Sequence, residues 1–151
     1  MTLGSSFVVA LRTAALGARK WFLVSAGLGV ALIVDGRIAG IDAHKVYGPA
    51  LLMPFILAAC FGSAAIARLR HRIGARLLDA DGRGFLLAAF AWSSICLAAS
   101  VATDWAASRF GLLGRAPNDL VDSIGMVFAV SALFTALVAI PAGRIDGSNG
   151  K

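Results

Sequence analysis

The stretch GFLLAAFAWSSICLAASVAT, residues 84–103, decides the class of this protein, because its 20 residues carry no charge. Arg83 precedes the stretch and Asp104 follows it. A helix needs about 20 consecutive apolar residues to cross the hydrocarbon core of a bilayer, which is ~30 Å thick. Residues 84–103 are therefore predicted to form a transmembrane helix.

The composition of the whole chain supports the same class. Hydrophobic residues make up 59% of the 151 positions, and the mean hydropathy is +0.83. A water-soluble domain of this length buries only about 70% of its unfolded surface, so it would leave much of this apolar surface in water. The excess of hydrophobic residues indicates that lipid surrounds part of the folded chain.

Three further apolar segments accompany residues 84–103. Two of them, about 46–67 and about 121–141, end at the basic cluster RLRHR and at a Pro-Ala-Gly-Arg stop, respectively. In the segment nearest the N-terminus, the uncharged run from Trp21 to Val34 has only 14 residues. At a rise of about 1.5 Å per residue it covers ~21 Å, which is too short to span alone.

A weak internal similarity suggests where this first span ends. KWFLVSAGL, from Lys20, and RGFLLAAFA, from Arg83, share a cation, a Phe-Leu pair and small residues. Aligning the two cations predicts a span over about 21–41, with Asp35 inside its outer third. The alternative is a helix that ends near Val34, followed by an Asp-Gly turn. A cleaved signal peptide is disfavoured by the long apolar segment before Lys20 and by the lack of an A-x-A site, so we expect the segment to be retained.

The expected fold is an all-α integral membrane protein, a single transmembrane domain over residues 1–151. Its four transmembrane helices form an antiparallel bundle, preceded by an interfacial helix over about 5–18. With four spans, ten of the Lys and Arg residues fall on the side of the termini and four on the other side. The positive-inside rule then places both termini in the cytoplasm of a multi-pass plasma (inner) membrane protein.

The candidate site is a set of polar residues at the outer face. An intramembrane charge costs about 2.5–3.5 kcal/mol at mid-bilayer and less near the edge, so Asp35 and Arg37 are functional candidates. Residues two apart point to different sides of a helix, and Asp35 is therefore expected to find its partner on another helix or subunit. The same face is predicted to carry Asp42, His44, Lys45, Tyr47, Asp104 and Trp105.

A second candidate is a basic ridge. Arg68, Arg72 and Arg76 recur at helical spacing where the second span meets the cytoplasm. Such a ridge suits anionic lipid head groups or an acidic partner, and the alternative is a plain stop-transfer signal. The net charge of +6 is attributed to membrane topology, and no nucleic-acid binding is predicted.

Small residues spaced four apart occur in two of the spans. They are Ala58 with Gly62, Ala59 with Ser63, Ser25 with Gly29, and Gly36 with Gly40. In lipid, close backbone approach at such residues supplies contact energy. The spacing does not separate packing inside the bundle from binding to another subunit.

The sequence contains no recognisable catalytic or cofactor-binding motif. His44 and His71 fall on opposite sides of the predicted membrane, so they cannot ligate one haem. No metalloprotease, nucleophile-elbow or phosphate-loop motif occurs. We therefore predict no catalytic residues, metal site or cofactor, and not an enzyme.

Two functions fit these observations. The first is a non-catalytic accessory or scaffold subunit of a larger membrane complex, which docks on other subunits or on itself. The second is a small homo-oligomeric transporter or channel that uses Asp35 for a proton, a cation or a small solute.

Overall fold

The structure, a computed structural model, describes residues 3–40, 43–76, 79–113 and 119–140. These residues form four helices and no strand: α1 (Leu3–Ile38), α2 (Ala43–Ile73), α3 (Ala80–Arg109) and α4 (Leu120–Ala139). All four are long and apolar enough to cross a membrane. The predicted all-helical chain with four such helices is confirmed.

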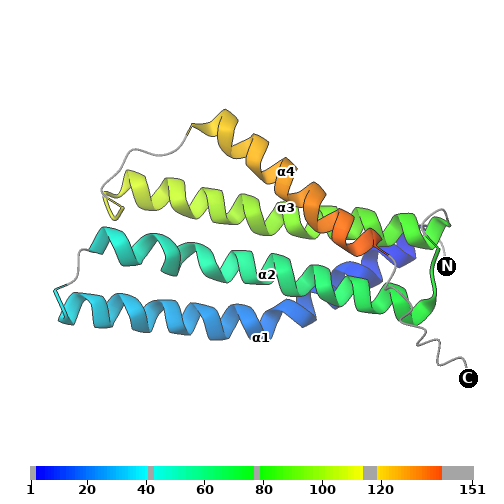
Figure 1. Cartoon of the computed structure of the whole chain (residues 1–151), viewed down its shortest axis with the longest axis horizontal. Coiled ribbons are helices and arrows are strands. Elements are labelled where there is room, and N and C mark those ends of the chain that lie inside the picture. Colours follow the sequence, from blue (N-terminus) through cyan, green and yellow to red (C-terminus); the bar gives the residue numbers. More distant parts are fainter. Residues whose placement is uncertain (1–2, 41–42, 77–78, 114–118, 141–151) are drawn as a thin grey trace, which may run out of the picture.

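Consecutive helices run antiparallel, so α1 begins and α4 ends at the same end of the bundle (Figure 1). We call this the basic end, since Arg68, Arg70, Arg72 and Arg83 lie there, and the other end, with Asp35 and Asp104, the acidic end. Among the described residues, the backbone of α4 comes close to those of α2 and α3 but not to that of α1. The bundle is therefore asymmetric, with α1 and α4 on different sides of the α2–α3 pair.

The first helix differs from the prediction. No break separates residues 5–18 from the span that was expected over 21–41, because α1 is one continuous helix of 36 residues. Its N-terminal part packs inside the bundle, where Ala10 and Ala14 are fully buried. A helix of this length extends about 54 Å, more than a hydrocarbon core requires. It also includes Asp35, so the alternative in which Asp35-Gly36 forms a turn after the helix does not hold.

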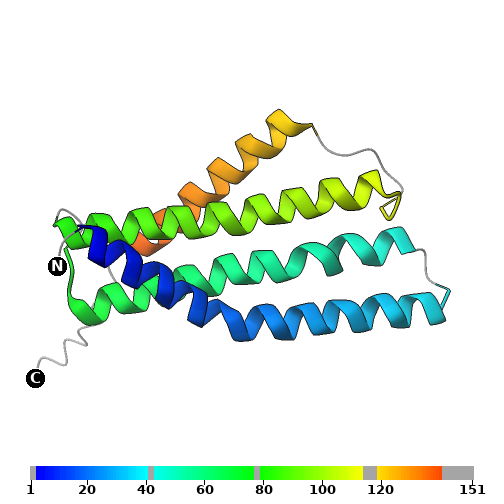
Figure 2. The same ribbon diagram turned by 180° about the vertical axis from the view of Figure 1, so that it is seen from behind.

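A bend lets α1 pack on two neighbours in turn. Its first part crosses α2 obliquely and reaches α3, and its second part runs along α2 (Figure 2). Gly17 lies where α1 crosses α2, and a Cβ atom there would come within 2.7 Å of the Ala65 Cβ. The crossing therefore depends on the missing side chain of Gly17.

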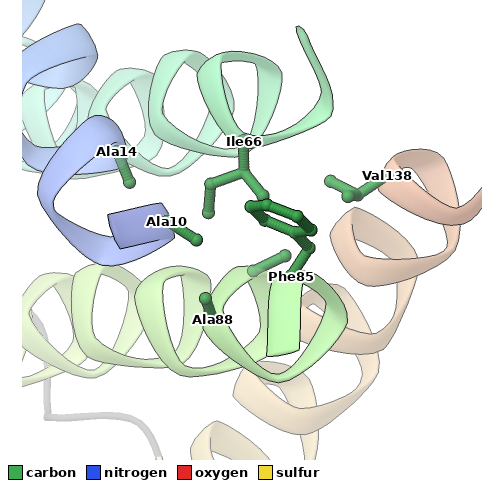
Figure 3. Packing of buried hydrophobic residues seen from close by; sticks show 7 residues of the cluster. Ala10, Ala14, Ile66, Phe85, Ala88 and Val138 are labelled. Carbon is green, nitrogen blue, oxygen red and sulfur yellow. The ribbon is translucent and has the colours of Figure 1, made fainter. Parts of the chain in front are cut away.

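Three clusters of buried side chains stack along the bundle axis. The basic-end core contains Ala10, Ala14, Ile66, Phe85, Ala88, Ala89 and Val138, and so joins all four helices (Figure 3). The middle core contains Ala18, Ala58, Ala59 and Cys96. The acidic-end core contains Tyr47, Ala107 and Leu113. Each core pairs a position in one helix with a position at the same depth in another.

The small-residue faces are used within the bundle. A Cβ atom on Gly62 would lie 2.0 Å from the Trp92 Nε1, and that same nitrogen donates a hydrogen bond of 2.9 Å to the Ala58 carbonyl. On α1, a Cβ atom on Gly29 would lie 2.8 Å from the carbonyl oxygen of Ala50. The small residues of α2 and the Ser25–Gly29 pair of α1 are buried in these contacts, whereas Gly40 lies beyond the end of α1 and is exposed.

Candidate functional site

The most enclosed acidic side chain of the predicted outer cluster is Asp104, in the last turns of α3. Asp104 is only 7% exposed, whereas the next residue, Trp105, is 46% exposed. The Arg109 guanidinium lies 4.9 Å from the centroid of the Trp105 ring, one helical turn further along. This contact is of the cation–π kind and holds both side chains on the outside of α3. Asp104 instead points between helices.

An apolar groove opens beside Asp104, because α4 leans away from α3 towards the acidic end (Figure 1). Its volume is about 550 Å³. Apart from Asp104 and Ser123 its lining is apolar or aromatic: Ala98, Val101, Ala102, Trp105, Leu120, Ile124, Val127 and Phe128. We call this the α3–α4 groove.

A smaller cavity of about 190 Å³ lies between the same two helices and α2. It shares Val101, Asp104, Ser123 and Val127 with the α3–α4 groove. Asp104 and Ser123 therefore stand at the border of both spaces, where α3 and α4 begin to separate. A carboxylate at this border is a polar group with apolar walls on both sides.

A narrow row of buried side chains, which we call the seam, packs α4 against the bundle. Its buried residues are Ser123, Ser131 and Val138, spaced eight and seven apart. Midway along the seam the Ser94 hydroxyl donates to the Ser131 hydroxyl over 3.0 Å. At the start of the helix the Asp119 carboxylate caps the backbone by accepting a hydrogen bond of 2.9 Å from the Val121 N–H. Large apolar side chains on the other faces of α4, including Val121, Met126 and Leu133, are exposed.

Asp35 does not border the α3–α4 groove. It lies in the last turn of α1, its side chain is exposed, and it lines neither of the cavities described above. Ile33, two residues earlier, packs on the acidic-end core, to which Ala107, three residues after Asp104 in α3, also belongs. Asp35 thus stands at or beyond the level at which the uncharged stretch of α3 ends.

The rest of the predicted outer cluster is only partly described. Tyr47 is 7% exposed and belongs to the acidic-end core, so it serves packing. Asp42, and the side chains of Arg37, His44 and Lys45, lie outside the described residues. The structure therefore brings Asp104 and Trp105 to the groove and places Asp35 away from it.

At the basic end the predicted ridge is shorter than expected. Arg68 and Arg72 are exposed on the last turns of α2, which continues beyond the apolar stretch as predicted. The helix stops at Ile73 because Gly74 adopts a left-handed conformation with φ of 69°. Arg76 is exposed but lies beyond the helix, so it does not continue the helical row.

Arg70 was not recognised from the sequence. It is 5% exposed, and its guanidinium donates to the Val138 carbonyl near the end of α4 and to the Ala75 carbonyl. The signal was available, because Arg70 follows buried Ile66 by four residues and so shares its face of α2. Arg70 links the end of α2 to the end of α4.

A second polar link lies at the basic end, outside the apolar stretches. The Ser6 hydroxyl of α1 donates to the Asp81 carboxylate in the first turn of α3. This hydrogen bond lowers the pKa of Asp81 below its usual value, because it stabilises the ionised carboxylate. The contact fixes the beginning of α1 against the beginning of α3.

The chemistry available at these places is limited. Within the described parts of the chain, no three His, Cys or Asp side chains come together to hold a metal ion. Cys60 and Cys96 are free thiols, and Cys96 belongs to the middle core. The α3–α4 groove suits an apolar occupant, such as a helix side or an acyl chain. The chain matches no protein-family model, no curated protein and no solved structure.

Proposed function

We propose that the protein is a non-catalytic accessory or scaffold subunit of a larger membrane complex. The observation that carries this proposal is the α3–α4 groove, an apolar space of about 550 Å³ that the described residues leave open. Large apolar surfaces on a folded protein commonly mark sites of interaction. A helix of another subunit would fill the groove and cover α4.

The uncovered faces of α4 support the same proposal. Large apolar side chains on this helix are more than half exposed, including Val121 at 75%, Met126 at 66% and Leu133 at 59%. In lipid such faces are tolerated, but they also offer a continuous surface for van der Waals packing with a neighbouring helix. Docking is therefore proposed on α4 and the groove, since the small-residue faces of α1 and α2 are already used inside the bundle.

The surroundings of the subunit follow from its charges. We place it in the plasma membrane with the basic end in the cytoplasm, because seven of the ten Lys and Arg residues outside α1 fall on that side. Arg68 and Arg72 are exposed there and would contact anionic lipid head groups. The lipid contact would orient the subunit and is not its principal interaction.

The test is purification of the tagged protein from its own membranes in mild detergent, followed by mass spectrometry. Ala98→Trp places an indole ring in the groove, and the matched control, Leu87→Trp, places one on a lipid-facing position of the same helix that is 50% exposed. We expect stoichiometric partner chains with the wild-type protein and Leu87→Trp, and at least about tenfold lower recovery with Ala98→Trp. A pure homo-oligomer, or equal recovery with both variants, would contradict the proposal.

The alternative function is a small homo-oligomeric transporter or channel. The observation in its favour is Asp104, a nearly buried carboxylate at the border of two cavities. Flux of protons or cations into vesicles containing the pure protein tests it. Loss of flux in Asp104→Asn, or in Asp35→Asn as first predicted, supports transport; flux equal to that of empty vesicles rejects it.

A further inference from the structure

Two cations of α1 lie in the middle of the bundle. Arg19 and Lys20 directly follow Ala18, which packs in the middle core against Ala58 of α2 and Cys96 of α3. Both cationic side chains are exposed at the outside of the bundle. Their depth is therefore that of the middle core, whichever side of α1 they face.

The middle core lies close to the centre of the apolar stretches. Cys96 comes 12 residues after Gly84 and eight residues before Asp104, which corresponds to ~18 Å and ~12 Å along α3. Ala58 comes ten residues before Arg68, or ~15 Å along α2. Both helices thus give a similar depth, near the middle of a hydrocarbon core of ~30 Å.

The N-terminus of α1 explains why this depth was not evident from the sequence. A Cβ atom on Gly84 would lie 2.9 Å from the carbonyl oxygen of Leu3, so α1 begins level with the start of the uncharged stretch of α3. The residues between Ser6 and Arg19 consequently occupy the depth of the membrane and do not lie beneath it. A cation at mid-depth is costly and calls for a partner.

The chain supplies no such partner among its described residues. Arg19 forms no hydrogen bond or ion pair with any of them. Their acidic residues all lie towards the ends of the bundle: Asp35, Asp104, Asp119 and Asp122 at the acidic end, and Asp79 and Asp81 at the basic end. A second copy in the same orientation would present these acids at the wrong depth as well.

A groove lies beside Arg19. It has a volume of about 410 Å³ and is lined by side chains of α1, α2 and α3, including Arg19, Phe22, Phe55, Trp92 and Ile95. Lys20 is not part of this lining. The groove lies where α1 bends away from α3, so it gives the side of a neighbouring helix access to the guanidinium of Arg19.

From this depth, groove and charge we infer that Arg19 binds a partner transmembrane helix through an Asp or Glu carboxylate that the helix carries near mid-membrane. The inference deepens the proposed function and rests on it. Arg suits this role because its planar guanidinium can hold a carboxylate through two hydrogen bonds. Lys20, about 100° around the helix, flanks the contact and faces away from the groove.

The experiment uses designed transmembrane peptides as the probe. The full-length protein is reconstituted in phosphatidylcholine vesicles with a dansyl-labelled Leu/Ala helix of about 20 residues. Three peptides carry Asp, Asn or Leu at the centre, and a fourth carries Asp one turn from its end. Binding is measured as energy transfer from the tryptophans of the protein. We expect the central-Asp peptide to bind at least about tenfold more tightly than the other three, a difference of about 1.4 kcal/mol.

Matched variants locate the contact. Arg19→Leu should remove the advantage of the central-Asp peptide, whereas Arg19→Lys should keep part of it and Lys20→Leu most of it. Equal binding of the Asp and Leu peptides to the wild-type protein would overturn the inference. Equal loss with Arg19→Leu and Lys20→Leu would overturn the assignment to the groove. Loss of the advantage on adding phosphatidylglycerol would make Arg19 a lipid-phosphate site and would also overturn it.

The outcomes separate this inference from the proposed function. Purified, reconstituted protein is used here, so the result does not depend on recovering a native partner. Native partners that depend on the α3–α4 groove but bind equally well to Arg19→Leu would leave the subunit function standing and remove the role of Arg19. If the peptide binds at Arg19 but purification recovers no native partner, the role of Arg19 stands and the proposed subunit function is removed.

Discussion

Single polar residues decide how the helices are tied together at the basic end. Ser6 links α1 to Asp81 of α3, and Arg70 links α2 to the carbonyl of Val138 in α4. Each pair is far apart in sequence, so neither could be matched from spacing alone. The two links act where the helices leave the apolar region and where polar contacts compete with water.

The Ser6–Asp81 link predicts a shift in titration. Ser6→Ala removes the donor, so the pKa of Asp81 should rise towards its usual value of 3.8. Since the folded-state pKa is lowered, the contribution to stability is present above the usual value and is lost as the pH falls through the lowered value. Carboxyl ¹³C NMR titration in micelles measures the shift. Thr13→Ala, which removes a hydroxyl bonded only within α1, is the control and should leave Asp81 unchanged.

The Arg70 link predicts a loss of stability. In Arg70→Met the Val138 carbonyl near the end of α4 loses its cationic donor, and hydrogen bonds to charged groups are worth about 1.5–3 kcal/mol. We expect the free energy of unfolding in mixed micelles to fall by about 2 kcal/mol, measured by denaturant titration with circular dichroism. Arg72→Met changes an exposed residue of the same turn and should stay within about 0.5 kcal/mol. Equal effects of the two changes would contradict the role of Arg70.

At the scale of the helix, small residues determine where α1 can approach its neighbours. Gly17 and Gly29 each lie against α2, at Ala65 and Ala50, whereas Gly27 has open space around it. The three positions have the same residue type, but Gly17 and Gly29 lie against a neighbouring helix and Gly27 does not. The bend and the depth of α1 depend on the first two.

This difference predicts opposite results for one substitution made two residues apart. Gly29→Ala places a Cβ atom 2.8 Å from the Ala50 carbonyl oxygen, and backbone at this distance must shift. Overpacking of this kind costs about 1–3 kcal/mol. Gly27→Ala meets no atom within 4 Å and should be neutral or gain up to about 1 kcal/mol of helix propensity. Thermal unfolding of both variants in the same detergent checks the prediction, and a similar loss in both would refute the close approach.

At the scale of the whole molecule, the depth of each helix relative to the others decides which charges meet lipid. The three cores pair Ala10 with Phe85, Ala18 with Cys96, and Tyr47 with Ala107, in order from the basic end to the acidic end. Asp35 then stands at the acidic end and Arg19 at mid-depth.

Cysteine labelling tests this depth and the proposed orientation together. In a background with Cys60→Ala and Cys96→Ala, single cysteines are introduced as Arg76→Cys, Asp35→Cys and Val24→Cys. With a membrane-impermeant maleimide we expect Asp35→Cys to react from outside intact cells and Arg76→Cys only after lysis, because they lie at opposite ends. Val24→Cys, two residues after Phe22 of the middle core, should stay protected in both cases. Labelling of Asp35→Cys and Arg76→Cys from the same side would reject the arrangement.

By itself, the sequence determined the all-helical class and the four apolar spans, since apolar length is a local property. It came within two residues of both ends of α4, but α2 and α3 extend beyond their predicted spans at both ends. It also placed Asp104 and Trp105 together at the same end of the third span. Only the tertiary structure decided that Asp104 borders a groove, that Asp35 is exposed at the end of α1, and that Arg19 lies at the level of the middle core. The reason is that the depth of α1 depends on Gly17, Gly29 and Gly84, which contact residues elsewhere in the chain. Such long-range contacts produce neither a periodic pattern nor an apolar run that could be recognised in the sequence.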